Sequence, residues 1–336
     1  MYTSKDYLKI PIDIKNKLVS ANLFFTENYE NNVKIRGQKM FYVWNDDFVL
    51  EARVKKVLFL QAAVLESEPF CLRGATDYQF FLNQAMSAFK GMGVQWILTG
   101  NTARFQYYPK GAVVAPCGNH IIDLTLSDAV LWNNVHSKHR NSIRRGEKSG
   151  IEIKIGGTEL VEQYTPLANE TYRRSGGTES NSNYYRKLID GLDNNACVFL
   201  AYKDNVLQSG AIFYYNEAIA YYLHGASIRK PEPGSTNYLL WEAVKYFKKK
   251  GIKEFSFVGY HYDPEPNSKL EGIQRFKERF GGVLEKSYNF RYECNPFAYK
   301  IFCVASQIKS GHPFKKYQDA IDKQVDKYPE LNGGIK

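Results

Sequence analysis

The sequence contains few cysteines, and none of them lies in a short paired motif. Five cysteines are spread over 336 residues, and no C-x-x-C occurs. This number and spacing argue against a disulfide-stapled secreted scaffold and against a structural zinc site. We therefore expect free thiols in a reducing cytoplasm, at Cys71, Cys117, Cys197, Cys294 and Cys303.

Long apolar runs are also missing. The longest, residues 57–65, is far shorter than the ~20 residues that a membrane span needs. The first residues, from Met1 to Tyr7, are polar and lack the apolar centre of a signal peptide. We therefore expect a soluble, cytoplasmic protein.

Several well-defined catalytic and cofactor motifs are absent. The sequence has no G-x-x-x-x-G-K-[ST], no G-x-G-x-x-G after a strand and no G-x-S-x-G, which argues against a Walker-type NTPase, a Rossmann enzyme and a serine hydrolase. His136 and His139 lie three apart on a predicted helix, but no neighbour completes a metal-ligand set. We expect these histidines to be polar helix surface, and we expect no metal and no cofactor.

What the sequence does contain is an unusual number of aromatic residues. Tyr, Phe and Trp number 25, 21 and 4, which is 15% of the chain, within an otherwise globular composition of 44% hydrophobic and 24% charged residues. Tyrosine suits long substrate clefts that are half apolar and half wet. A thick-cored sheet protein would explain the same numbers slightly better.

The chain is also basic. Its formal net charge is +10 and its isoelectric point is about 9.1. Such a surplus favours polyanionic partners such as nucleic acid, nucleotide-sugars or an acidic membrane surface. A solvated basic surface with no such partner is an equally good interpretation.

Hydrophobic periodicity and turn residues predict alternating strands and helices, as in an α/β or α+β protein. The clearest sheet is an antiparallel meander over residues 196–202, 206–215 and 218–226. We predict a hairpin at 41–54, strands at 94–98, 151–155, 254–258 and 283–292, and helices at 76–90, 127–149, 159–194, 236–250 and 270–280. The inner faces of two helices should be formed by Phe80, Phe81, Ala85, Ala88 and Phe89, and by Leu240, Val244 and Phe247.

The length suggests two domains. We place the boundary near residue 150, which gives an N-terminal domain over residues 1–150 and a C-terminal domain over residues 151–310. The remaining residues 311–336 form a lysine-rich tail that we expect to be weakly ordered.

The predicted helix at 127–149 is strongly basic. Arg140, Arg144 and Lys148 are spaced four apart and share one face. Like charges at this spacing destabilise an isolated helix by a few tenths of a kcal/mol per pair, which a polyanionic ligand would offset. A solvated face, partly neutralised by Glu147, explains the pattern equally well.

The predicted helix at 270–280 places a lysine next to an apolar stripe. Ile273, Phe276 and Phe280 span an arc of roughly 60° on a helical wheel. Lys277 flanks that stripe, so it must reach solvent, meet an anion or lose its proton. A cleft in which negative charge develops would satisfy it, and a lysine that reaches solvent at the core edge is the alternative.

Several separated segments resemble the FemABX aminoacyltransferases. They are the basic helix with Lys138, Arg140, Ile143, Arg144 and Arg145, then Tyr222-Leu-His-Gly-Ala-Ser, the helix that opens Thr236-Asn-Tyr-Leu-Leu-Trp, Phe255-Ser-Phe-Val-Gly-Tyr, and Gly272-Ile-Gln-Arg-Phe-Lys-Glu-Arg-Phe-Gly-Gly. The last is the most specific. The resemblance covers residues 69–292, in the family's order and spacing.

The resemblance implies a fold of two GNAT-like domains, each a mixed sheet flanked by helices. It implies transfer of an amino acid from aminoacyl-tRNA to the amine of a cell-wall peptide or a related cell-surface precursor. Phe276 and Lys277 would lie at the transfer site, where the lysine stabilises the oxyanion, and the protein would be a monomer. Polyanion contacts are expected from Lys138, Arg140, Arg144 and Arg145, and substrate contacts from Tyr184, Tyr185, Tyr222, His224, Tyr260 and Arg229.

Two departures from the family pattern matter. Members that bind a muropeptide nucleotide often carry an Arg shortly before a Tyr-Tyr pair, but no Arg occurs between Arg174 and Arg186 around Tyr184-Tyr185. The acceptor is therefore expected to differ from the usual peptidoglycan unit. The chain also has no long heptad segment, so we expect no coiled-coil arm.

Two other functions stay open at this point. One is an N-acyltransferase on the same scaffold that moves an acyl group from CoA or a carrier protein to an amino-sugar. GNAT enzymes hold the CoA pyrophosphate on backbone N–H groups at a helix start. The matching turn here contains Pro231 and Pro233, which supply no N–H. The other is a non-catalytic nucleic-acid-binding protein, which would leave the position of Lys277 unexplained.

Overall fold

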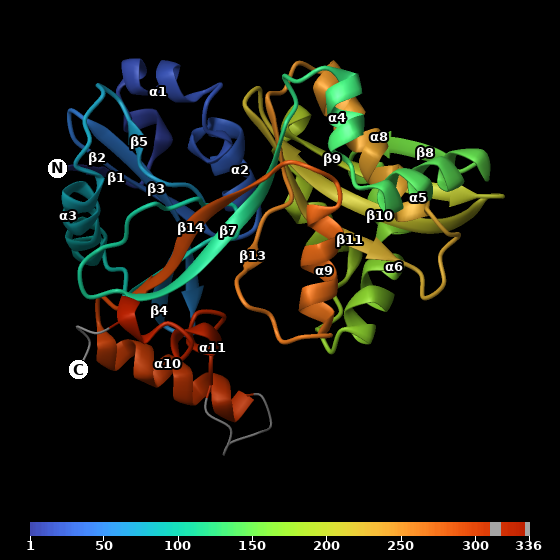
Figure 1. Ribbon diagram of the computed structural model, residues 1–336. Helices are drawn as coiled ribbons and strands as arrows, with labels where there is room; N and C mark the ends of the chain where they lie inside the picture. Colours follow the sequence, from blue (N-terminus) through green and yellow to red (C-terminus); the bar gives the residue numbers. More distant parts are fainter. Residues whose placement is uncertain (310–316, 333–336) are drawn as a thin grey trace. The chain divides into compact units, whose positions relative to one another are not determined.

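The computed structural model describes residues 1–309 and 317–332. The chain forms two compact units that interleave in sequence (Figure 1). Unit 1 contains residues 1–19, 24–118 and 285–336, and unit 2 contains residues 20–23 and 119–284. Two long strands, β7 (Val113–Asp123) and β14 (Val283–Tyr292), each contribute residues to both units.

The units divide the chain differently from the predicted boundary at residue 150. The basic helix before residue 150 belongs to unit 2, and residues 285–309 return to unit 1. The reason is that the chain enters unit 2 along β7 and leaves it along β14. A boundary of this kind produces no shift in composition.

Unit 1 is built on a mixed sheet. Its strands follow the order β1-β2-β3-β4-β6-β14, with β5 beside β3. All neighbours are antiparallel except β4 and β6, which are parallel. The bounds are β1 (Tyr2–Ser4), β2 (Lys39–Trp44), β3 (Phe48–Val57), β4 (Leu60–Leu65), β5 (Phe70–Cys71) and β6 (Trp96–Thr99).

Helices cover this sheet. α3 (Tyr78–Gly91) begins where the side chain of Asp77 accepts a hydrogen bond from the amide of Phe80. Its buried face contains Phe81, Ala85 and Phe89, as predicted, but the ring of Phe80 is exposed and Ala88 is only half-buried. The other helices of unit 1 are α1 (Ile12–Leu18), α2 (Glu27–Ile35), α10 (Pro296–Lys309) and α11 (Asp322–Val325), with 3-10 turns at Tyr7–Lys9 and Pro329–Leu331. A further 3-10 turn, Leu23–Phe25, contains residues of both units.

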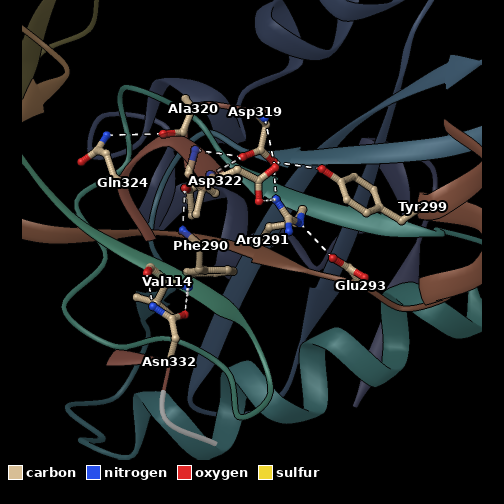
Figure 2. Close-up of polar contacts among 12 residues, drawn as sticks. Val114, Phe290, Arg291, Glu293, Tyr299, Asp319, Ala320, Asp322, Gln324 and Asn332 are labelled. Atoms are coloured by element: carbon tan, nitrogen blue, oxygen red, sulfur yellow. Dashed lines mark hydrogen bonds and ion pairs between the residues drawn. The ribbon is translucent and has the colours of Figure 1, made fainter. Parts of the chain in front are cut away.

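The described part of the C-terminal tail is held firmly against unit 1 (Figure 2). The buried guanidinium of Arg291 bonds to Asp319 at 2.6 Å and to Asp322 at 2.8 Å. Asn332 pairs with both backbone groups of Val114 at 2.9 Å. The expectation of a weakly ordered tail is therefore wrong for residues 317–332, because acidic residues there neutralise a buried arginine. Residues 311–316 and 333–336 lie outside the described residues.

The strands of unit 2 are likewise in a mixed arrangement. They follow the order β7-β12-β11-β10-β9-β8. β11 and β12 are parallel, and the other neighbours are antiparallel. The predicted meander is confirmed as β9 (Ala196–Lys203), β10 (Val206–Tyr215) and β11 (Ile219–Ser227), and the remaining strands are β8 (Glu152–Gly156), β12 (Glu254–Ser256) and β13 (Tyr260–His261), which pairs with β7.

The helices of unit 2 pack on a large aromatic core. Leu240, Val244 and Phe247 of α8 are fully buried, as predicted. The predicted helix at 127–149 is interrupted at Val135 and His136, where the extended backbone starts a new helix. The helices are α4 (Asp128–Asn134), α5 (Ser137–Lys148), α6 (Val161–Arg174), α7 (Ser182–Ile189), α8 (Ser235–Lys249) and α9 (Lys269–Glu278), with 3-10 turns at Thr158–Leu160 and Asp193–Asn195.

The expected architecture of mixed sheets flanked by helices is therefore confirmed. The longest helix among residues 1–309 and 317–332 has 15 residues, so the described chain contains no coiled-coil arm. In the same residues, no helix combines the length and the apolar character of a membrane span.

Candidate active site

Lys277 lies on the inner side of α9, with its ammonium withdrawn from solvent. The Nζ atom donates hydrogen bonds to two backbone carbonyls, those of Val258 and Gly259, the latter at 2.9 Å. Burial lowers the pKa of Lys277 to about 8. An ammonium has three N–H donors, so two are used by these carbonyls and one is available to a further acceptor.

The neighbours of Lys277 on α9 fulfil only part of the predicted stripe. Phe280 is buried and Phe276 packs against the core of unit 2, as expected. Ile273 is exposed, and the side chain of Gln274 is buried in its place. Gln274 donates from its amide to the carbonyl of His261, which gives a buried polar group its partner.

The segment that receives the Lys277 ammonium has an unusual backbone. Val258 and Gly259 both have positive φ, at 39° and 48°. A β-branched residue rarely adopts such a conformation, and strained residues of this kind persist only where the surroundings impose them. The surroundings here are the hydroxyl of Ser256, which accepts from the Val258 amide at 3.2 Å, and Asn119 Oδ1, which accepts from the Gly259 amide at 3.0 Å.

Two histidines lie near α9. The ring of His139, on α5, contacts the carbonyl of Phe276 through Nε2 at 3.0 Å, and burial lowers its pKa to about 4. It is therefore a buried packing residue, not the polar surface residue predicted. His120, on β7, is also buried, and its Nδ1 has no hydrogen-bond partner.

His120 belongs electrostatically to the surroundings of Lys277. Burial lowers the pKa of His120, the carboxylate of Glu278 raises it, and the ammonium of Lys277 lowers it further. Its backbone carbonyl accepts from the amide of Phe257 at 3.0 Å, so the strand that carries His120 also positions the start of the strained segment. An unpartnered buried ring nitrogen is costly.

A second cluster in unit 2 consists of tyrosines around His224. Nδ1 of His224 and the hydroxyl of Tyr172, on α6, are 3.2 Å apart, and burial lowers the pKa of His224 to about 4. Tyr185, on α7, is fully buried, and its hydroxyl has no hydrogen-bond partner. Tyr184 lies edge-on to Tyr185 with ring centroids 5.2 Å apart, and is exposed.

A β-bulge in β11 determines where the second cluster's residues point. Ile212 pairs with His224 and Phe213 pairs with Tyr222, so Leu223 is an extra residue. The extra residue breaks the alternation of faces. As a result, His224 meets Tyr172 while the ring of Tyr222 packs on Phe213, with centroids 5.6 Å apart.

Phe257 connects the two clusters. Its ring centroid lies 5.9 Å from that of Tyr222 and 5.2 Å from that of Phe280. The ring of His120 is edge-on to it at 6.4 Å. The structure therefore brings Tyr222, Phe276 and Lys277 into one continuous aromatic region of unit 2.

The two remaining predicted substrate residues are Tyr260 and Arg229. Tyr260 is half-buried and donates to Glu278 Oε1 at 2.8 Å. Arg229 is exposed in the turn before α8. Sequence reasoning missed Asn119, His120 and Tyr172, because a single His or Asn in an apolar strand gives no signal until the strand's neighbours are known.

The predicted polyanion residues divide into two groups. Arg140 is half-buried and donates from Nη1 to the carbonyls of Asn133 and Val135, at 3.0 and 2.5 Å. Arg140 therefore caps the C-terminal end of α4, and it is not part of an exposed basic face as predicted. Lys138 is exposed, and an open pocket of about 460 Å³ is lined by Asn141, Arg144, Arg145, Lys148 and Ser149.

The turn before α8 is closely packed against α5. A Cβ atom added to Gly234 would lie 2.2 Å from the carbonyl oxygen of Ser142 and 2.8 Å from the amide nitrogen of Gly146. A Cβ on Gly146 would in turn meet the carbonyl oxygen of Gly234 at 2.8 Å. The backbone of the turn before α8 therefore packs directly against α5 at Gly234.

Sequence comparison identifies relatives. A model of the FemAB family matches residues 83–206 and 202–307. A lipid II:glycine glycyltransferase from Staphylococcus haemolyticus is 27% identical over 118 residues, and its counterpart from Staphylococcus aureus is 29% identical over 100 residues. These alignments cover 34% and 29% of this chain, but only 28% and 24% of the relatives, so the matched part spans less than a third of their length.

Structure comparison extends the similarity to most of the chain. The crystal structure of FemX aligns with a TM-score of 0.67 and 17% identity, over 90% of this chain and 99% of FemX. The C-terminal domain of a putative lysylphosphatidylglycerol synthetase from Agrobacterium fabrum aligns with a TM-score of 0.55 and 12% identity, over 88% and 96% of the two chains. At these identities the comparison concerns the fold.

Proposed function

This chain belongs to the FemAB family, and from that premise we propose that it is an aminoacyltransferase. The proposed reaction moves an amino acid from aminoacyl-tRNA to the amine of a cell-wall precursor. The curated relatives are named as transferring glycine to lipid II, which supports an acceptor of this class. The observation that carries the proposal is the buried Lys277 ammonium, held against the strained turn at Val258 and Gly259.

The reaction needs a donor for the oxygen that becomes negative. The acceptor amine attacks the ester carbonyl of the donor, the new C–N bond forms, and the C–O bond to the ribose breaks. In the proposed role, the third N–H of Lys277 donates to the carbonyl oxygen as its charge develops. Because the ammonium is already desolvated and fixed by two carbonyls, it reorganises little during the reaction.

The reaction also releases a proton from the attacking amine. We assign its acceptance to Nδ1 of His120, which is buried, has no partner and carries a lowered pKa. A neutral imidazole is the form that accepts a proton. The proton then passes to the ribose oxygen that leaves, so no proton is gained or lost overall.

The tyrosine cluster is the proposed binding region for the acceptor. Tyr184 is exposed beside the buried Tyr185, whose hydroxyl has no hydrogen-bond partner. Tyr222 and Tyr260 adjoin the same aromatic region. Tyrosine rings with polar tips suit a peptide that is part apolar and part polar.

The basic pocket on α5 is the proposed contact for the tRNA phosphates. Arg144, Arg145 and Lys148 line it and are exposed, and charged side chains of this kind bind phosphates independently of sequence. Arg229 is a further exposed cation near the start of α8. The turn before α8 favours tRNA over CoA as the carrier, because Pro231 and Pro233 supply no N–H for a pyrophosphate and Gly234 packs against α5.

The test is a donor and acceptor screen with the purified chain. The protein is incubated with a mixed pool of charged tRNAs and, separately, with acyl-CoAs, in the presence of candidate amine acceptors. Mass analysis then identifies the modified acceptor. The proposal predicts aminoacylated cell-wall precursor with the tRNA pool. Product formed with acyl-CoA alone would overturn it in favour of the N-acyltransferase.

A further inference from the structure

α10, in unit 1, has apolar residues on both of its faces. On the inner face, Tyr299 is buried and the ring of Phe302 stacks on Trp96, with centroids 4.8 Å apart. Positions 297, 301, 304 and 308 lie opposite, within an arc of roughly 60°. This outer stripe is open to solvent, with Phe297, Val304 and Ile308 being 73%, 56% and 65% exposed and Ile301 half-buried.

The turn between β3 and β4 is a second exposed apolar feature of unit 1. Two residues, Leu58 and Phe59, form its tip, and they are 62% and 77% exposed. Leu58 has a positive φ of 58°. Asn and Gly are the residues usually found in such two-residue turns, so a bulky Leu-Phe pair here is costly both in backbone strain and in solvent exposure.

These two features are neighbours. Val57 and Leu60, which flank the tip, belong to the same apolar cluster as Tyr299 and Phe302 of α10. Figure 1 shows β4 beside α10 at one end of unit 1. The tip and the outer stripe therefore both adjoin this cluster, and together we name them the apolar end of unit 1. It consists of Leu58, Phe59, Phe297, Ile301, Val304 and Ile308.

The charged side chains on and next to the two apolar features in sequence are basic. Lys55 and Lys56 precede the tip, and Lys300 and Lys309 lie on α10; all four are exposed. The sequence has no Asp or Glu over residues 52–65 or 294–309. Three carboxylates, those of Glu293, Asp319 and Asp322, share the single guanidinium of Arg291 (Figure 2).

We propose that the apolar end of unit 1 docks on an anionic phospholipid bilayer. Large apolar side chains would enter the boundary between headgroups and acyl chains, while the lysines contact lipid phosphates. The four exposed lysines favour an anionic bilayer over a second copy of this chain, because the lysines of two such surfaces would repel each other. The protein would lie on the membrane, since none of its described helices is suited to span it.

This inference deepens the proposed function, because a lipid-linked acceptor is reached only at a membrane surface. Docking itself requires no turnover, so the two proposals can fail separately. The purified full chain is sedimented with phosphatidylcholine vesicles that contain or lack phosphatidylglycerol. We expect binding only with phosphatidylglycerol, and weaker binding at high salt, since each lysine near the surface contributes about fivefold to the partition coefficient.

Variants identify the surface. The triple variant Phe59→Ser, Phe297→Ser, Ile308→Ser should bind at least about tenfold more weakly, because each large apolar side chain loses its burial. The matched control is Leu8→Ser, Ile12→Ser, which removes side chains that are equally exposed elsewhere on unit 1. Both variants should keep wild-type activity toward a water-soluble acceptor peptide, which shows that they fold.

Three outcomes would overturn the inference. One is equal sedimentation of the triple variant and the control with anionic vesicles. Another is a dimer of the wild type in lipid-free buffer that becomes a monomer in the triple variant, which would assign the surface to self-association. The third is absence of binding to anionic vesicles by a wild-type protein that is active on the soluble acceptor, which would remove the membrane role and leave the proposed function intact.

Discussion

Replacing Lys277 with methionine is the sharpest test of the proposed chemistry. Methionine keeps the length and apolar stem of the side chain but removes the ammonium. In the wild type, two N–H donors satisfy the carbonyls of Val258 and Gly259, and the third is assigned to the oxyanion. The loss of one oxyanion donor typically lowers kcat by ~10²-fold or more, equivalent to about 3 kcal/mol.

The same substitution has a structural cost that must be separated from the catalytic one. It leaves two buried carbonyls without a donor, at about 1–3 kcal/mol each, but it also removes a desolvated charge, which partly offsets that loss. We therefore expect a modest change in thermal stability, a large fall in kcat and little change in KM. Lys269→Met, an exposed lysine on the same helix, is the control and should keep normal turnover.

Chemical rescue distinguishes the charge from the packing. Lys277→Cys should be inactive, and its alkylation with 2-bromoethylamine, which rebuilds an ammonium of nearly the same length, should restore activity. Wild-type protein treated in the same way controls for the other cysteines. Near-normal turnover of Lys277→Met, or inactive Lys277→Cys that alkylation does not rescue, would refute the oxyanion role.

The remaining predictions concern other groups. Because the ammonium is the active form and its pKa is about 8, kcat should fall as pH rises through about 8; a rise there would instead identify a neutral amine that acts as base. His120→Gln should lower kcat while thermal stability and KM stay close to wild type, and unchanged turnover would remove the proton role. Arg144→Gln, Arg145→Gln should weaken tRNA binding and flatten its dependence on salt, whereas Arg140→Gln should lower stability, because Arg140 closes α4; an unchanged salt slope in the double variant would contradict the phosphate contact. Burial raises the pKa of Glu51 from 4.5 to about 8, so the stabilisation from its protonated carboxyl is fully present below pH 4.5 and is lost as pH rises through about 8. In urea unfolding at pH 8, Glu51→Gln should raise the free energy of unfolding by about a few kcal/mol. An unchanged free energy of unfolding would show that Glu51 ionises freely. Calorimetric titration with acetyl-CoA should show no saturable binding in the low micromolar range at physiological salt, and such binding would reject tRNA as the carrier.

The elements that the sequence predicts well are those with strong local signals. The meander of β9, β10 and β11 has apolar runs separated by tight polar turns, and α8 has a regular buried face, so both follow from local pattern. The hairpin of β2 and β3 is predicted for the same reason. By contrast, α4 and α5 read as one helix, because the break at Val135 and His136 contains neither Gly nor Pro.

The division into units could not be predicted. The division depends on β7 and β14, each of which runs from one unit into the other. Local sequence does not show which strands do this. The packing of residues 317–332 against unit 1 could not be predicted either, since it depends on a contact between Arg291 and Asp319, which are not neighbours in sequence. Whether such a segment is ordered depends on its long-range ion pairs, which its amino-acid composition does not reveal.

The candidate site was predictable only in part. The wheel of residues 270–280 correctly places Lys277 beside the apolar side, but it misassigns Ile273 and Gln274, because the segment that packs on α9 offers a carbonyl at His261. The strain at Val258 depends on Asn119 and Ser256. Neither residue carries a sequence signal, so the geometry around the lysine emerges only in the fold.

The most direct test of the central claim is a single-turnover assay with purified lipid-linked precursor and charged tRNA. The mass of the acceptor is measured before and after the reaction, with one sample of the charged tRNA treated beforehand with ribonuclease. We expect the acceptor to gain one aminoacyl residue and ribonuclease to abolish the gain. Product that persists after ribonuclease treatment, or that forms only when acyl-CoA is added, would contradict it.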